Sequence, residues 1–145
     1  MIMTLADIRR EYTFGSLRRA DLDTNPILQF QNWFNQMSAA NSGGRYRKIS
    51  LALYQLWQAV LGHSPADLNA MVLSTVDKNG RPSSRNVLLK DLDHCGFTFF
   101  TNYQSRKGRE LTENPNAALV FYWREWGRQV CVAGSVKKMS IKESE

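Results

Sequence analysis

Cations lie at both ends of one apolar stretch and at the start of a helix-like stretch that follows it. Arg85 and Lys90 enclose an Asn-Val-Leu-Leu sequence, and the adjacent Arg106 and Lys107 follow Ser105. A helix N-terminus already carries partial positive charge, so cations there are a poor choice for stability alone. They become favourable when backbone N–H groups and side-chain charge hold an anion together. The arrangement predicts a phosphate-bearing cofactor bound over a strand, a turn and a helix.

The spacing of these cations limits how they can share a ligand. Side chains alternate faces along a strand, so Arg85 and Lys90, five positions apart, are expected on opposite sides. Unless a bulge intervenes, they favour two anionic groups, or one group reached from the end of the strand. For each cation alone, a solvated surface charge is the simpler interpretation. Four cations in this arrangement favour a site.

Other chemistries have little support in the sequence. No Ser/His/Asp set is legible, and no phosphate-loop or dinucleotide glycine motif is present. His63 and His94 lack metal-ligand spacing, and we interpret Cys95 and Cys131 as reduced, structural residues. We therefore predict no catalytic side chain and no metal site, and any chemistry is expected to belong to a bound cofactor.

The composition indicates one globular domain with a basic balance. The chain has 145 residues, 43% hydrophobic and 22% charged, with a formal net charge of +6. Such a charge favours anionic partners, but the cations are dispersed outside one cluster at residues 45–48, and no stacking platform is evident. A nucleic-acid binder is therefore the last-ranked hypothesis. No apolar run has the length of a membrane span and no signal peptide is visible, so a cytoplasmic protein is expected.

Two helices are expected before the strands. Asn25 as N-cap and Pro26 at the first helical position begin the first helix. Its apolar side chains recur at helical spacing and are assigned to the core: Ile27, Phe30, Trp33, Phe34 and Met37. The helix is expected to end near residues 41–44. Residues 49–61 carry a second helical pattern.

From residue 69 the period becomes strand-like. Strands are expected at residues 70–76, 83–90, 97–101, 117–123 and 128–136. Asn79-Gly80 predicts a hairpin between the first two, residues 91–96 a second turn, and Ser105 the cap of a helix reaching residue 113. The predicted fold class is mainly β (α+β), an antiparallel sheet curling towards a small barrel with flanking helices.

Several ordered blocks carry a resemblance to a known family. They are residues 9–12, 85–90, 99–102, 105–108, 120–123, 128–130 and 134–138. Together they closely resemble the pyridoxamine/pyridoxine 5′-phosphate oxidase family, FMN enzymes that make pyridoxal 5′-phosphate. The resemblance covers most of residues 7–40 and 67–139. It implies an FMN-binding split β-barrel, incomplete in this chain, and a homodimer with flavin at the subunit interface.

The resemblance also implies roles for individual residues. Arg85 and Lys107 would hold the FMN phosphate, with Arg106 beside them. The rest of the flavin would be lined by Asn86, Val87, Leu88, Leu89, Lys90, Phe100, Thr101 and Gln129. Lys90 would also bind the substrate phosphate, together with Arg9 and Tyr12 of an arm that closes over the site. In such enzymes hydride passes from the substrate C4′ to flavin N5, and O₂ reoxidises the flavin.

Two departures from the family pattern shape the expected organisation. We expect an arm at residues 1–24, a helical segment at 25–66 with an atypical insertion at about 41–65, and a partial barrel at 67–145. The chain stops where family members reach their middle, so a truncated form is expected. The expected function is oxidation of pyridoxamine 5′-phosphate or pyridoxine 5′-phosphate to pyridoxal 5′-phosphate with O₂ as acceptor. The alternative is an FMN-binding or dimerising split-barrel protein without oxidase activity; neither involves nucleic acid or membrane.

Overall fold

The computed structural model describes residues 15–43 and 68–140. The arm that carries Arg9 and Tyr12, the basic cluster at 45–48, His63 and the second helix expected at 49–61 lie outside these ranges. Five strands form an antiparallel sheet in the order β3-β2-β1-β4-β5. The strands are β1 Ala70–Val76, β2 Pro82–Asp93, β3 Gly96–Phe99, β4 Asn116–Trp123 and β5 Arg128–Ser135. The helical elements are η2 Arg19–Asp21, α1 Pro26–Gly43, α3 Arg106–Glu113 and η3 Arg124–Trp126.

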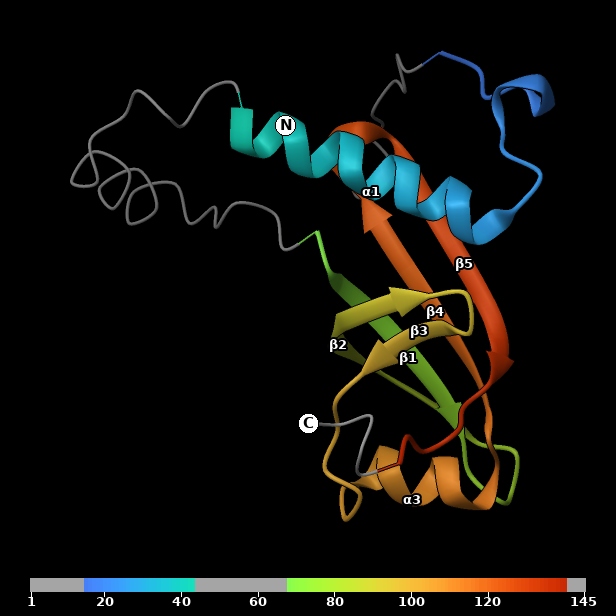
Figure 1. The fold of residues 1–145 in the computed structure, drawn as a ribbon. Helices are drawn as coiled ribbons and strands as arrows, with labels where there is room; N and C mark the ends of the chain where they lie inside the picture. Colours follow the sequence, from blue (N-terminus) through green and yellow to red (C-terminus); the bar gives the residue numbers. More distant parts are fainter. Residues whose placement is uncertain (1–14, 44–67, 141–145) are drawn as a thin grey trace, which may run out of the picture.

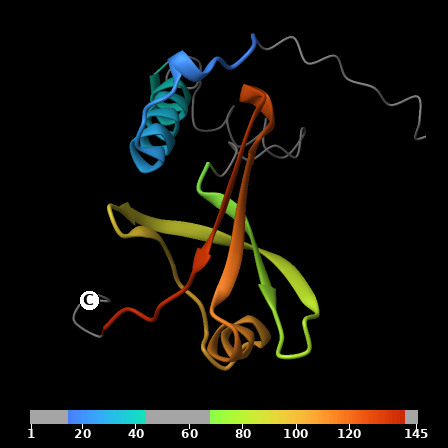
Figure 2. The same cartoon turned by 90° about the vertical axis from the view of Figure 1, so that its right-hand side faces the viewer.

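Helices α1 and α3 lie at opposite ends of the sheet. Figure 1 shows α1 across one end and α3 beneath the other, beside the turn that joins β1 to β2. The turned view in Figure 2 shows the strands twisting and the sheet curling between the helices. The arrangement is that of a split β-barrel, which confirms the predicted fold class. In the described ranges, no helix combines the length and apolarity needed to cross a bilayer.

The β1–β2 hairpin forms where Asn79-Gly80 predicts it. Gly80 has a φ of 79°, which a glycine adopts without a steric penalty. The Asp77 carboxylate closes the turn, since its Oδ1 accepts hydrogen bonds from the Asn79 amide at 2.8 Å and the Arg81 amide at 2.9 Å. The hairpin places Arg85 opposite Leu73 of β1.

The second turn is shorter than expected. β2 continues through Asp93, with Asp91 opposite Thr98 and Leu92 opposite Phe97, so the prediction of a turn over 91–96 was wrong. Half-buried Leu92 extends the apolar face of the strand, and the Asp93 carboxylate accepts two amide hydrogen bonds that tighten the turn at 94–95. The pairing register shifts between Leu89 and Asp91.

α1 covers the core from one end. The Asn25 side chain accepts hydrogen bonds from the Ile27 amide at 2.9 Å and the Leu28 amide at 3.4 Å, which confirms the predicted cap. The Phe30 ring lies 4.8 Å from that of Phe121 and 5.0 Å from that of Phe97, measured between centroids. The buried core consists of Phe30, Met37, Met71, Leu73, Leu89, Leu119, Phe121 and Trp123. Of the predicted stripe on α1, Phe30 and Met37 are buried, and Trp33 and Phe34 pack around them half-buried.

Candidate functional site

The buried carboxylate of Glu110 forms ion pairs with two of the predicted cations, Arg85 and Arg106. Glu110 of α3 is 4% exposed, and its Oε2 lies 3.2 Å from Nη2 of Arg85 on β2. Its Oε1 accepts a 2.7 Å hydrogen bond from Nε of Arg106, one helical turn earlier. Hydroxyl groups of Thr75 and Ser83 also donate to Oε2. We call Thr75, Ser83, Arg85, Arg106 and Glu110 the Glu110 cluster.

Within the Glu110 cluster, Arg85 is tied firmly to the sheet. Its Nη1 donates to the carbonyl oxygen of Leu73 at 3.2 Å and to the hydroxyl of Thr75 at 2.6 Å, and its Nη2 also donates to Ser83. The Arg85 side chain is 22% exposed, whereas that of Arg106 is 65% exposed. Arg85 is therefore held by the sheet on most sides, whereas most of the Arg106 side chain is exposed to solvent.

The start of α3 is fixed by its cap and by a close backbone contact. Ser105 caps the helix as predicted, because its hydroxyl accepts from the Gly108 amide at 3.3 Å and donates to the carbonyl of Asn102 at 2.6 Å. A Cβ on Gly108 would lie 2.4 Å from the carbonyl oxygen of Tyr103, so only glycine fits here. The first-turn amides of Arg106 and Lys107 have no partner inside the helix. Positive charge and unpaired amides thus meet at this helix terminus, which suits an anion.

The Glu110 cluster also sets the protonation state of its carboxyl group. Hydrogen bonds from Thr75 and Ser83, with the Arg106 guanidinium, lower the pKa of Glu110 from 4.5 to about 2, although burial acts in the opposite direction. Glu110 is therefore ionised at neutral pH. Counted with Lys107, three cations and one carboxylate leave two net positive charges at this end of the sheet.

The predicted stretch 85–90 is divided between the two faces of the sheet. Arg85, Val87 and Leu89 lie on the inner face, where Leu89 is buried in the core. The alternate positions Asn86, Leu88 and Lys90 are exposed on the outer face. Arg85 and Lys90 thus lie on opposite sides, as the alternation predicts, and Lys90 occupies the position where the register shifts.

Phe100 and Thr101 follow β3 and lead towards α3. The sequence places both in a strand, but β3 ends at Phe99, and Phe100 is 64% exposed. The hydroxyl of Thr101 is buried and, among the described residues, has no hydrogen-bond partner. An unsatisfied buried hydroxyl costs about 1–3 kcal/mol, so a ligand that supplies the missing partner would be favoured there.

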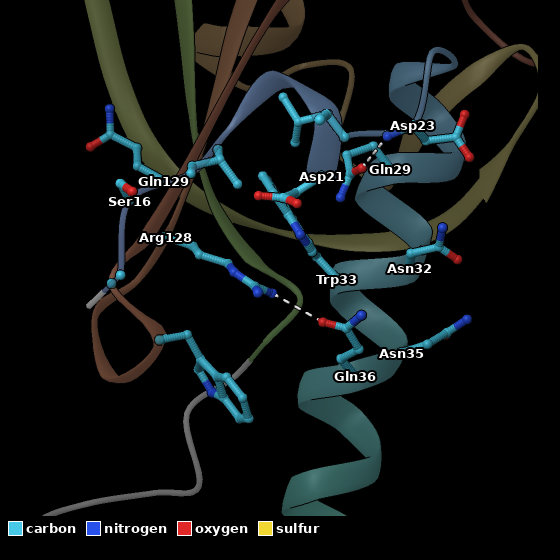
Figure 3. A pocket seen from close by; sticks show the side chains of 16 residues that line it. Ser16, Asp21, Asp23, Gln29, Asn32, Trp33, Asn35, Gln36, Arg128 and Gln129 are labelled. Atoms are coloured by element: carbon cyan, nitrogen blue, oxygen red, sulfur yellow. Dashed lines mark hydrogen bonds between the residues drawn. The ribbon is translucent and has the colours of Figure 1, made fainter.

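Gln129 lies apart from the Glu110 cluster. It is the second residue of β5, is exposed on the outer face opposite Tyr122, and lines a groove at the α1 end of the molecule. The groove encloses about 1120 Å³ between residues 15–23, α1 and the β4–β5 turn (Figure 3). Its wall is held by Arg128, whose guanidinium lies 4.8 Å from the Trp33 ring centroid and donates to Gln36 Oε1 at 3.4 Å. This groove was not predicted from the sequence, because its lining comes from segments about 100 positions apart.

One further group of metal-ligand types occurs at the β2–β3 turn. One ligand atom from each of Asp93, His94 and Cys95 lies within 4.8 Å of the others, and all three residues are exposed. Asp93 Oδ1 is already used by two amides of the turn, and Cys95 Sγ lies 3.4 Å from His94 Nε2. This group closes the hairpin, and the prediction of no metal site remains a prediction.

The structure thus brings together Arg85 and Arg106, with Lys107 on the same helical turn, and leaves Lys90 and Gln129 elsewhere. Glu110, which joins the two arginines, was missed from the sequence. Its spacing of four residues from Arg106 was the available signal, because such pairs face each other on a helix. An acidic residue in a short polar helix otherwise resembles solvated surface.

Comparison with known proteins gives consistent matches. The family model described as "Pyridoxamine 5'-phosphate oxidase" matches residues 63–145. A protein from Nostoc punctiforme named pyridoxine/pyridoxamine 5′-phosphate oxidase is 46% identical over 100% of this chain and 57% of its own length. One of the same name from Burkholderia mallei is 46% identical over 98% and 56%. A crystal structure of PhzG from Burkholderia lata 383, in complex with tetrahydrophenazine-1-carboxylic acid, covers 68% of this chain and 50% of that chain, with 32% identity and a TM-score of 0.53. The chain spans little more than half the length of these curated relatives.

Proposed function

The chain belongs to the pyridoxamine 5′-phosphate oxidase family, and we propose that it binds FMN and oxidises pyridoxamine 5′-phosphate or pyridoxine 5′-phosphate to pyridoxal 5′-phosphate. The observation that carries this proposal is the convergence of Arg85 and Arg106 on Glu110, with Lys107 beside them at the capped start of α3. The names of the 46% identical relatives support the reaction. When bound, FMN would accept hydride from the substrate and pass electrons to O₂.

In this proposal the protein supplies placement and charge. Arg106 and Lys107 would bind the FMN phosphate directly, since the Arg106 Nη groups and the Lys107 ammonium make no hydrogen bond or ion pair with other described residues. Arg85 would add its charge and its Nε–H group. The Thr101 hydroxyl would find a partner on the cofactor. The remaining flavin contacts are proposed at the exposed residues Asn86, Leu88, Lys90 and Phe100 and at the backbone of Val87 and Leu89, whose side chains face the core. Gln129 is proposed to contact a part of the flavin remote from the phosphate, since it lies away from the Glu110 cluster.

Lys90 is proposed to bind the substrate phosphate. It is exposed at the register shift of β2, on the opposite face from Arg85, which suits a second anionic group. Arg9 and Tyr12 are proposed to complete this site. A second copy of the chain is proposed to cover the outer face, where Leu88 is 42% and Tyr122 57% exposed. Burying such side chains between two copies would be favourable.

An FMN-binding split-barrel protein without oxidase turnover is the second candidate. It is favoured by the likeness to the PhzG structure, which is 32% identical with a TM-score of 0.53. The PhzG structure, whose title names a tetrahydrophenazine-1-carboxylic acid complex, also indicates that similar folds take other ligands.

Two measurements on purified protein separate these candidates. Protein mixed with FMN and passed through a desalting column should retain yellow flavin absorbance under either candidate. Hydrogen peroxide released after adding pyridoxamine 5′-phosphate in air supports the oxidase alone. Retained flavin without peroxide supports the binding protein, and loss of all flavin on the column contradicts both.

A further inference from the structure

Both carboxylate oxygens of Glu110 accept hydrogen bonds inside the protein. Its two carboxylate oxygens accept from four donors: the hydroxyl groups of Thr75 and Ser83, Nη2 of Arg85 and Nε of Arg106. Three of these donors meet at Oε2 and the fourth reaches Oε1, so each oxygen is bound to at least one donor of the fold. Because the residue is 4% exposed, this geometry has little freedom to relax.

The same hydrogen bonds determine which arginine donors remain available. Arg85 has five N–H groups, and its Nη1 and Nη2 bonds to Leu73, Thr75, Ser83 and Glu110 occupy four of them, leaving Nε–H. Among the described residues, Arg106 bonds to Glu110 through Nε alone, which leaves both of its Nη groups. The two guanidinium groups are thus fixed by one shared carboxylate at the start of α3.

We propose that Glu110 is a positioning residue for the phosphate of the cofactor: by holding Arg85 and Arg106 through opposite oxygens, it orients their free N–H groups towards a common anion. This inference rests on the proposed FMN binding. A carboxylate near a phosphate is repulsive by itself, but its charge is offset by two arginines. With Lys107, the site keeps two net positive charges, which match a phosphate monoester of about −1.5 to −2 at pH 7.

A purely structural role is the competing explanation. Glu110 joins α3 to β1 and β2 through Thr75 and Ser83, and it could do only that. Riboflavin distinguishes the two roles, since it has the ring system of FMN without the phosphate. A structural role predicts equal losses for both flavins, whereas positioning predicts a loss for FMN alone.

The experiment compares flavin affinities, measured by fluorescence quenching, for the wild type and Glu110→Gln. We expect the FMN affinity to fall about tenfold, the loss of roughly one charge-assisted hydrogen bond, with riboflavin affinity unchanged. Glu113→Gln is the matched control, because it removes the same charge from an exposed position on the same helix and should leave FMN affinity within about twofold.

Other results overturn the inference. They are an FMN affinity of Glu110→Gln equal to that of the wild type, and parallel losses for FMN and riboflavin. If Glu110→Gln does not fold, the same comparison of FMN and riboflavin affinities is made with Ser83→Ala. This variant removes one hydrogen-bond donor to Glu110 at a partly exposed site. Failure of the proposed function looks different: the wild type itself would then show no preference for FMN over riboflavin.

Discussion

The two ends of β2 hold their cations in different ways. Arg85 is 22% exposed, makes four hydrogen bonds and shares a buried carboxylate with α3. Lys90 is exposed at a register shift and makes no hydrogen bond or ion pair with any other described residue. Stability and ligand binding are therefore expected to be coupled at Arg85 and separate at Lys90.

The difference comes from what lies beside each end. At Arg85 the strand pairs with β1, against which α3 packs, so a charged side chain there must be neutralised by neighbours. At Lys90 the partner is the short β3, whose pairing is interrupted, and the side chain extends into solvent. The four predictions below test this contrast.

The largest effect is expected when two cations at the α3 end are removed together. Arg85→Ala with Lys107→Ala should lower FMN affinity by about a hundredfold or more, since each charge-assisted contact contributes about 1.5–3 kcal/mol. Fluorescence titration measures it. The control is Lys78→Ala with Arg81→Ala, which removes the same charge from the exposed β1–β2 turn. Equal affinities in the two double variants would remove the case for a phosphate site at α3.

The next largest difference is expected in the free energy of unfolding of variants at the two ends of β2. Arg85→Ala leaves the Glu110 carboxylate buried with one partner fewer, so the free energy of unfolding should fall by about 3 kcal/mol. Lys90→Ala should change it by less than about 0.5 kcal/mol, because the side chain is exposed. Urea unfolding followed by tryptophan fluorescence gives both values. A similar loss in both variants would mean that the Glu110 cluster has no special structural role.

For substrate binding, Lys90 is expected to matter more than Arg85. Lys90→Ala should weaken the binding of pyridoxamine 5′-phosphate about tenfold, through the loss of one phosphate contact, and lower FMN affinity much less, because the FMN phosphate is proposed to bind at α3. Titration of the FMN-loaded protein with substrate under anaerobic conditions measures the first value. A variant that loses FMN as well would place both phosphates at one end of β2.

The smallest effect is expected in the free energy of unfolding when the pH is lowered. The folded pKa of Glu110 is about 2, below the ordinary 4.5, so its ionised form stabilises the fold above pH 4.5. This contribution is lost as pH falls through 2. The difference in unfolding free energy between the wild type and Glu110→Gln should thus be constant from pH 5 to 7 and shrink from pH 4.5 to 2. A difference that grows on acidification would mean that the pKa of Glu110 is raised.

Local signals in the sequence predicted most of the sheet and its caps. Asn79-Gly80, Asn25-Pro26 and Ser105 mark turns and helix starts through their own backbone chemistry, so the elements begin where expected. The end of β2 was missed because Asp93 reads as a turn residue, and only its pairing with Gly96 shows that the strand continues to it.

The candidate site was predicted only in part. The alternation of a strand sufficed to separate Arg85 from Lys90, and the adjacent cations after Ser105 indicated the helix terminus. Glu110 was not predicted as a site residue, because its burial depends on the packing of β1 and β2 against α3. No local sequence pattern indicates that packing. The placement of Gln129 at the far groove likewise depends on the order of strands in the sheet.

A crystal structure of this chain with FMN tests the central claim most directly. The account predicts phosphate oxygens about 2.7–3.2 Å from nitrogens of Arg106 and Lys107, at the start of α3, with Glu110 still bound to both arginines. A phosphate bound instead in the groove beside Arg128, with the Glu110 cluster unchanged and open to solvent, would contradict it.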